Sequence, residues 1–479
     1  MEVIPITIPD SRSVFRETRT RTFFVIDDVL DEVKLRDGLT RLIQDHWRKL
    51  GARIVKKDNN NFEYHLPSVF PPDYELFRMT TSTSSESIAK AAPDLDLNPS
   101  SPHGGPILLA GTDVVDAHFR PQHWPMTMSA EPGAPLLLIH VSLYTDATVI
   151  TTSAPHMLAD QMGLALIVKA WMGVIKGQAP PPMVGYNEDI LPGQKPSASY
   201  PKAEFYKRGR AHLKRPGERF FQLLRFSWEM AREPKEDHVV LFFPTELVQT
   251  LRERYASVTG KVDNKSELSA GDIITAVTTK LARITRKSEI TMSLSQTINY
   301  RNRIPSLPPS ISAGYIHNAL IYGTARIRYT PSIPVSTIAY ANRAAVDKVA
   351  SDPELIDTLV AIQRELVRRG QSDHICEMFE TSYHITNWAP AWRDLDFSPA
   401  LADGRGKKKL KLVVFGEGSK TGSPKRYISN LMCKSADGYW VNFGVPTRTM
   451  KGLKRYLAAD PLLEKLDDGE AAYALATDG

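Results

Sequence analysis

The chain has 479 residues, of which 42% are hydrophobic and 24% are charged. A single compact core rarely grows to this size, so length and composition predict an ordinary globular protein with two domains. The net charge is only +6 and is not gathered in one basic run. This balance favours an anionic small-molecule ligand over a nucleic-acid backbone.

The only cysteines, Cys376 and Cys433, are too few for a disulfide framework, which predicts buried thiols in a reducing compartment. The N-terminus lacks a basic segment followed by an apolar one, so it does not read as a secretory signal. The longest apolar runs, such as 134–139, are far too short to span a bilayer. We therefore predict a cytoplasmic protein without a membrane partner.

Hydrophobic periodicity predicts the elements of the first half of the chain. Residues 30–51 favour an amphipathic helix that Asp31 caps at its start and Gly51 ends. Two short strands are expected within 52–66, around a turn at Asn59-Asn60-Asn61. Residues 135–152 indicate two strands joined near Thr145-Asp146, and 160–177 a helix.

Residues 178–236 are rich in proline and polar side chains, which is typical of a crossover between domains. We predict a first domain over 1–185, a linker over 186–236 and a second domain over 237–479. Strands are expected in the second half from 238 and over 290–300, 409–417, 427–433 and 438–445; helices are expected over 269–286, 353–369 and 447–466. Mixed strands and helices place the fold in the α/β class.

The segment His156-Met157-Leu158-Ala159-Asp160 carries the candidate chemistry. A histidine can take a proton from an alcohol, because its ordinary pKa is about 6.5. In a helical turn His156 and Asp160 would share a face, whereas a loop could turn Asp160 away to brace the backbone through a salt bridge. Asp160 could also cap a helix that starts at Gln161. Spacing alone leaves these possibilities open.

Four sequence segments, taken in their order along the chain, indicate the role of His156 and Asp160. They are PHMLADQMG at 155–163, with Gly163 two residues later than usual, SAGDIITAVTTKLAR at 269–283, NYRNRIPSLPPSISAGYIHNA at 299–319, and Thr386-Asn387-Trp388 followed by Asp396-Phe397-Ser398-Pro399-Ala400. Together they resemble the BAHD acyltransferases of the chloramphenicol acetyltransferase-like superfamily, over nearly the whole chain. The similarity is greatest to the O-acyltransferases of fungal secondary metabolism.

This resemblance implies two chloramphenicol acetyltransferase-like domains, each a mixed sheet flanked by helices, with a channel between them. Acyl-CoA would enter from one face and a small-molecule alcohol from the other. His156 would be the general base that deprotonates the acceptor, which attacks the thioester directly. No permanently bound cofactor is implied, and the histidines show no zinc-binding helix pattern, so no metal is expected.

The resemblance also assigns roles to residues around His156. Asp160 would hold the loop and point away from the substrate. Trp388 would donate its N–H to the oxyanion of the tetrahedral intermediate, and Thr386 would help position the substrate. Asp396 would pair with Arg301 or Arg303, with Arg301 preferred. Ser398-Pro399-Ala400 replaces the usual Gly-Trp-Gly, so the conformation of that loop is not predicted.

The phosphates of CoA require cationic or helix N-terminal partners. Lys265, Ser266 and Ser269 stand at the start of the helix expected from 269, in the region that the family uses near CoA. The lysine run 407–409 with Lys411 is a second candidate, whose alternative is a solvated loop before a strand.

Three alternatives stay open at this point. The acyl group could come from a carrier protein, as in condensation domains, although Pro155 stands where those domains have a first histidine. The acceptor could be an amine. The chain could also bind a metabolite or promote a cyclisation without transferring a group. A monomer is expected by analogy with the family.

Overall fold

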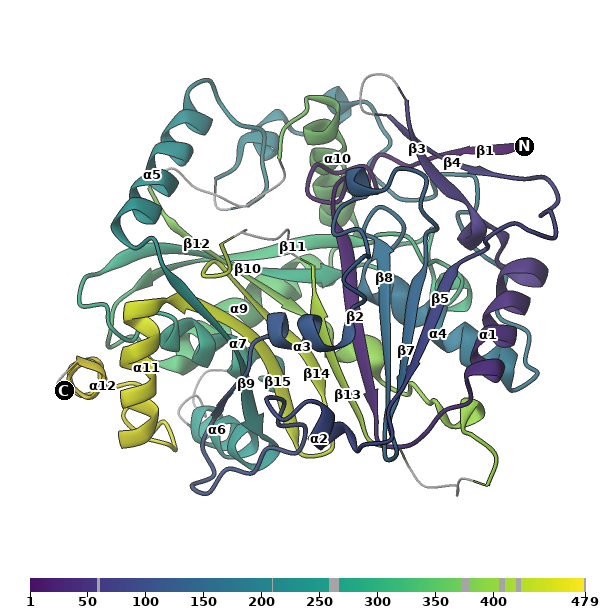
Figure 1. Ribbon diagram of the computed structural model, residues 1–479. Coiled ribbons are helices and arrows are strands. Elements are labelled where there is room, and N and C mark those ends of the chain that lie inside the picture. The colour runs from purple at the N-terminus through teal and green to yellow at the C-terminus, as the bar shows by residue number, and fades with distance from the viewer. Residues whose placement is uncertain are drawn as a thin grey trace.

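The computed structural model describes residues 1–57, 61–208, 210–257, 267–372, 379–404, 410–418 and 424–477. Its first large sheet has five strands in the order β13-β2-β8-β7-β5 (Figure 1). These strands are β2 (Arg19–Ile26), β5 (Arg78–Thr83), β7 (Leu138–Leu143), β8 (Thr148–Pro155) and β13 (Leu412–Glu417). β2 and β8 are buried along their whole length, so this sheet is covered on both faces.

The second large sheet has seven strands in the order β11-β10-β12-β14-β15-β9-β6. They are β6 (Ile107–Leu109), β9 (Glu236–Pro244), β10 (Ile290–Asn299), β11 (Leu320–Tyr329), β12 (Thr381–Asn387), β14 (Ile428–Lys434) and β15 (Gly438–Pro446). A small third sheet orders β1 (Glu2–Pro5), β4 (Phe62–Leu66) and β3 (Arg53–Lys56) as β1-β4-β3.

Helices flank both large sheets. The α-helices are α1 (Glu32–Arg41), α2 (Ile88–Ala91), α3 (Thr112–Phe119), α4 (Gln161–Ile175), α5 (Glu218–Arg232), α6 (Thr245–Ser257), α7 (Ala270–Leu281), α8 (Pro309–Ser312), α9 (Val335–Ala350), α10 (Pro353–Arg368), α11 (Thr447–Ala459) and α12 (Gly469–Thr477). In the described residues no helix combines the length and the apolarity needed to cross a membrane. The predicted α/β class of sheets flanked by helices is confirmed.

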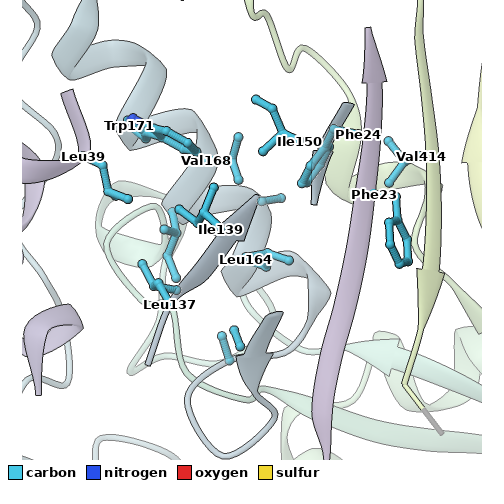
Figure 2. Packing of buried hydrophobic residues seen from close by; sticks show 14 of the residues in the cluster. Phe23, Phe24, Leu39, Leu137, Ile139, Ile150, Leu164, Val168, Trp171 and Val414 are labelled. Carbon is cyan, nitrogen blue, oxygen red and sulfur yellow. The ribbon is translucent and has the colours of Figure 1, made fainter. Parts of the chain in front are cut away.

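The apolar core on one face of the five-stranded sheet fixes α4. Figure 2 shows Leu164, Val168 and Trp171 of this helix beside Ile139 and Ile150 of the sheet. Leu39 of α1 closes the layer from outside. Because successive strand residues point to opposite faces, Phe24 faces this layer while the adjacent Phe23 points to the other face of the sheet, where its cross-strand partner is Phe415. The start of α4 is thereby held at the end of β8.

The two large sheets exchange strands between the halves of the chain. β13 comes from the second half, yet it pairs antiparallel with β2 and forms an edge of the five-stranded sheet. β6 comes from the first half and pairs with β9 at the edge of the seven-stranded sheet. The domain boundaries at 185 and 237 stay a prediction, and the sheets themselves cross them.

Most predicted elements are present at or near their expected positions. Asp31 caps α1 by accepting from the backbone N–H groups of Val33 and Lys34. The expected end of this helix is wrong, because a π-helical turn over Leu42–His46 and a 3-10 turn over Arg48–Gly51 follow it. Gly51 is needed for packing instead, since a Cβ there would lie 2.9 Å from the Phe70 ring.

The predicted linker over 186–236 is only partly irregular. It contains the fifteen-residue helix α5, which the sequence reading missed because proline-rich segments surround it. β3 and β4 form the expected antiparallel pair, but most of their turn lies outside the described residues. Cys433 is a buried free thiol, as expected, and Cys376 lies outside the described residues.

Candidate active site

The segment 156–160 is a loop between β8 and α4, so His156 and Asp160 do not share a helix face. Asp160 caps α4, and its Oδ1 accepts from the N–H of Gly163 at 2.8 Å. A Cβ on Gly163 would lie 1.7 Å from the carbonyl oxygen of Ile316. Only glycine therefore lets the first turn of α4 approach the chain leading into β11 this closely.

Asp160 is held by a buried bidentate salt bridge. Its two oxygens accept from Nη1 and Nη2 of Arg301 at 3.0 Å each, and both side chains are at most 3% exposed. Oδ2 also accepts from the N–H of Ala319 at 3.0 Å. Arg301 donates further to the carbonyls of Tyr315 and His317. This places Asp160 in the framework that joins the loop to the second half of the chain.

The predicted pairing of Asp396 with Arg301 or Arg303 is wrong. Arg301 pairs with Asp160, and Arg303 donates to the carbonyls of Asn299 and Ala350. Asp396 is exposed and accepts from both the N–H and the hydroxyl of Ser398, at 2.9 and 2.7 Å. Ser398-Pro399-Ala400, which replaces the usual Gly-Trp-Gly, thus forms a local 3-10 turn, and Ser398 occupies the carboxylate.

Two carbonyls at the start of the loop 156–160 are bound by side chains from distant elements. Nδ2 of Asn318 donates to the carbonyl of His156 at 2.8 Å. The Tyr64 hydroxyl donates to the carbonyl of Met157 at 3.1 Å. Because these carbonyls are anchored from opposite halves of the chain, the backbone that carries His156 has little freedom to move.

The next carbonyl, that of Leu158, contacts Nδ1 of His317 at 3.0 Å. Nζ of Lys49 lies 3.0 Å from Nε2 of the same ring. Burial and the Lys49 charge both lower the pKa of His317, so its ring is neutral at pH 7. A neutral ring that donates from Nδ1 and accepts at Nε2 satisfies both contacts.

The His156 ring is partly buried and stacks on Phe15, with ring centroids 3.9 Å apart and planes 18° apart. The Arg12 guanidinium lies 4.1 Å from the Phe15 ring centroid. Burial lowers the pKa of His156 to about 4, and the Arg12 charge acts in the same direction. Asp160 opposes this shift only weakly. His156 is thus unprotonated at neutral pH, which is the state a general base requires.

Asn318 is placed to orient the His156 ring. Its Nδ2 donates to Asp10 Oδ1 and to the His156 carbonyl, both at 2.8 Å. The amide orientation is therefore fixed, because a flipped amide would place its own oxygen against these two acceptor oxygens. Oδ1 of Asn318 and Nδ1 of His156 are both buried, and neither has a hydrogen-bond partner of normal geometry in the described residues. The side chain of Asn318 raises the pKa of His156 through hydrogen bonding, against the effect of burial.

This geometry makes a prediction about Asn318 as a positioning residue. Asn318→Ala is expected to lower kcat by about 10- to 100-fold, because small misplacements of a catalytic group have effects of this size. KM for the acyl donor should change little. Steady-state kinetics of the variant would show this split. Asn342→Ala is the matched control, since Asn342 is also buried but donates to Asp272 away from the loop; an equal loss of kcat in the control would contradict the assignment.

Trp388 lies just after β12, and its backbone N–H donates to the carbonyl of Leu431 at 2.8 Å. Its ring covers Gly416 of β13, where a Cβ would lie 2.3 Å from a ring carbon. Gly416 pairs with Thr22 of β2, whereas the N–H of His156 donates to the carbonyl of Thr18. These two positions are about 13 Å apart along an extended strand. The oxyanion role of Trp388 therefore stays a prediction.

Thr386 lies in β12 opposite Asn430 of β14 and is partly buried. Its neighbour Asn387 approaches the start of α7, since a Cβ on Gly271 would lie 3.1 Å from the Asn387 amide nitrogen. A small cavity separates α7 from the sheet at this point; it is lined by Gly271, Ile274, Thr275, Thr278, Ile385, Asn387, Ser429, Leu431 and Val441. The substrate-positioning role of Thr386 stays a prediction.

The candidate CoA-binding residues are only partly described. Lys265 and Ser266 lie outside the described residues, as does the lysine run 407–409. Ser269 caps α7, and its hydroxyl donates to Asp272 Oδ2 at 2.7 Å within a capping box. A carboxylate thus already occupies the start of this helix, which does not favour Ser269 as a phosphate ligand. Lys411 forms an ion pair with Asp437 at 3.6 Å.

Several residues of this site were missed by sequence reasoning. Asn318 and His317 fall inside the quoted segment 299–319, whose match was a signal for them. Phe15 and Tyr64 come from segments without any recognisable motif. Among the described residues, no group of three or more histidines, cysteines or carboxylates is arranged to hold a metal ion.

The two sheets and the loop 156–160 form an architecture that can be compared with those of known proteins. Two mixed sheets flanked by helices exchange strands, and an HxxxD loop joins a strand of one sheet to a helix whose capping aspartate binds an arginine from the other half. No family model matches the sequence. Individual proteins resemble the chain in sequence and in fold.

Curated fungal proteins resemble the chain over most of its length. Acetyltransferase adrJ of Penicillium rubens is 27% identical over 423 residues, covering 84% of this chain and 82% of its own. O-acyltransferase ausP of Aspergillus calidoustus is 24% identical over 91% of each chain. A protein named transcriptional regulator calD, from Penicillium decumbens, is 26% identical over 96% of each chain. The relatives thus bear two kinds of name.

Solved structures show the same fold. TRI101 of F. sporotrichioides, in complex with coenzyme A and T-2, superposes with a TM-score of 0.63 at 14% identity, covering 95% of this chain and 97% of its own. Vinorine synthase superposes with a TM-score of 0.54 at 12% identity, covering 94% and 91%. The resemblance to BAHD-type acyltransferases predicted from the motifs is thereby confirmed.

Proposed function

We propose that the protein is an acyltransferase that transfers an acyl group, acetyl or another short acyl, from acyl-CoA to a hydroxyl group of a secondary metabolite. The observation that carries this proposal is His156: a neutral histidine on a loop anchored from both halves of the chain. Fungal relatives named acetyltransferase and O-acyltransferase support it, as does the fold shared with a protein that binds coenzyme A.

In the proposed reaction, His156 takes the proton from the acceptor hydroxyl while the oxygen attacks the thioester carbonyl. The tetrahedral intermediate collapses by breaking the carbon–sulfur bond, and the departing thiolate receives the proton from the histidinium. The charge of Arg12 near the ring disfavours the histidinium, so proton return to the leaving group is favourable. The indole N–H of Trp388 is the proposed donor to the oxyanion.

The lowered pKa of His156 predicts an unusual pH profile. With a base of ordinary pKa 6.5, kcat/KM would decline below neutral pH, whereas a pKa of about 4 keeps the base free well into the acid range. We expect kcat/KM to stay level from neutral pH down to about pH 5. The stabilisation from the neutral ring is complete above pH 6.5 and is lost progressively as the pH falls from 6.5 to about 4, so the melting temperature should be measured at each pH. Initial rates across this range would test it, and a midpoint near 6.5 would contradict it.

The proposed function is tested by supplying acyl-CoA donors with a panel of fungal metabolite alcohols and reading acceptor mass. The expected result is a product heavier by one acyl group, with release of an equivalent amount of free CoA thiol. If transfer occurs only from acyl chains loaded on a carrier protein, the donor is the acylated carrier protein and not acyl-CoA. Metabolite binding by calorimetry, without transfer from either donor, would show a non-transferring binding protein instead.

A further inference from the structure

Helix α5 is attached to the rest of the protein through polar side chains. Glu218, at its start, is buried and lies 2.8 Å from Nε2 of His212. Arg225 lies about two turns further along the same face of the helix and donates to the Thr381 hydroxyl at 2.9 Å. Glu229 accepts from the Tyr427 hydroxyl at 2.8 Å. The polar stripe of this amphipathic helix therefore faces the protein, which is the reverse of the usual arrangement.

The opposite face of α5 is apolar and exposed to solvent. The large side chains on this face and their exposed fractions are Phe220 (64%), Phe221 (48%), Leu223 (56%), Leu224 (56%) and Trp228 (70%). Phe226 (40%) lies outside this face, with its ring beside Tyr427. At about 100° per residue these five positions fall within about 160° of the helix surface. They present an apolar area on the order of 400 Å². A contiguous patch of this size on one helix marks a surface that another body covers.

The exposed charges of α5 are all positive. Its two acidic residues face the protein, while Arg219 and Arg232 are exposed at either end of the helix. Lys235 is exposed just after the helix. Figure 1 shows α5 at the periphery of the molecule, away from the five-stranded sheet. An apolar face that carries tryptophan and phenylalanine, bordered by arginines, is the pattern of a helix lying in a membrane interface.

We propose that α5 docks the protein onto an anionic lipid surface. In this arrangement Phe220, Leu224 and Trp228 insert among the lipid chains, while Arg219 and Arg232 meet the phosphate headgroups. The expectation of no membrane partner rested on apolar runs too short to span a bilayer, and a helix lying in the interface needs no spanning segment.

Co-sedimentation with vesicles tests the proposal, using phosphatidylcholine with and without phosphatidylserine. The wild-type protein should sediment with the vesicles that contain phosphatidylserine. Phe220→Ser/Trp228→Ser should lower the bound fraction at least about tenfold, through the loss of apolar burial. Arg219→Gln/Arg232→Gln should lower partitioning onto the anionic vesicles by about fivefold per charge. Val69→Ser is the matched control, because Val69 is 78% exposed outside the helix and should leave binding unchanged.

All substituted side chains are at least partly exposed, so far-ultraviolet circular dichroism and thermal melting should show the variants folded like the wild type. Two results would overturn the proposal. One is wild-type protein that stays in the supernatant with anionic vesicles, or a serine double variant that sediments equally well. The other is a wild-type dimer in sedimentation velocity that the serine variant dissociates without any vesicle binding, which would make this face an interface between two copies of the chain.

Discussion

Replacing His156 with alanine is expected to lower single-turnover acyl transfer by about 10²- to 10⁴-fold, the range over which general-base catalysis contributes. The neutral imidazole of His156 is the group proposed to take the acceptor proton. The other histidine beside this loop, His317, is buried and has both ring nitrogens occupied by Leu158 and Lys49. Rapid mixing of excess enzyme with acyl-CoA and an acceptor found in the screen measures the chemical step directly.

His103→Ala is the matched control for this experiment, because His103 is exposed and should not affect the rate. Removing the His156 ring also leaves Phe15 without its stacking partner, so CoA binding by calorimetry and the melting temperature should accompany the rates. If the variant binds CoA, melts normally and still transfers the acyl group at close to the wild-type rate, His156 is not the base.

The order of elements around His156 was predictable because hydrophobic periodicity is a local property. Two strands, a loop and a helix were expected over 135–177, and β7, β8 and α4 occupy that range. The cap at Asp160 was an open alternative in the sequence, and the structure selects it. Local pattern could not show which arginine it binds, since Arg301 lies 141 residues away.

The partners of His156 were harder to predict because each comes from a separate part of the chain. Phe15 belongs to an N-terminal turn region without periodicity, and Tyr64 to a short strand of the small sheet. The same limit explains the wrong partner for Asp396. A family pattern assigned it an arginine, but the serine that replaces a glycine in this chain supplies its own hydroxyl and N–H to the carboxylate. A residue that departs from the family pattern thus changes the contacts of those neighbours that its own side chain and backbone can reach.

Replacing Asp160 with asparagine should lower the free energy of unfolding by about 3–5 kcal/mol, because removing one partner leaves a buried charge without compensation. Arg301 is only 3% exposed on its side chain, so water cannot solvate the remaining guanidinium. Urea unfolding at neutral pH measures the loss. Asp403→Asn is the control: it removes a carboxylate paired with Lys34 at 2.7 Å, but one that is 93% exposed. Because solvent screens this exposed pair, the variant should unfold close to the wild-type urea midpoint.

The double variant Asp160→Asn/Arg301→Met separates the charge from the rest of the contact. Since neither charge remains, the double variant should lose less stability than the sum of the two single variants. Activity should fall with stability in the single variants, because the displaced loop carries His156. An Asp160→Asn protein that unfolds at the wild-type urea midpoint and yet has no activity would contradict the framework role. That result would mean that the carboxylate takes part in the reaction directly. We do not expect it, because the hydrogen bonds to Arg301 and Ala319 occupy both carboxylate oxygens.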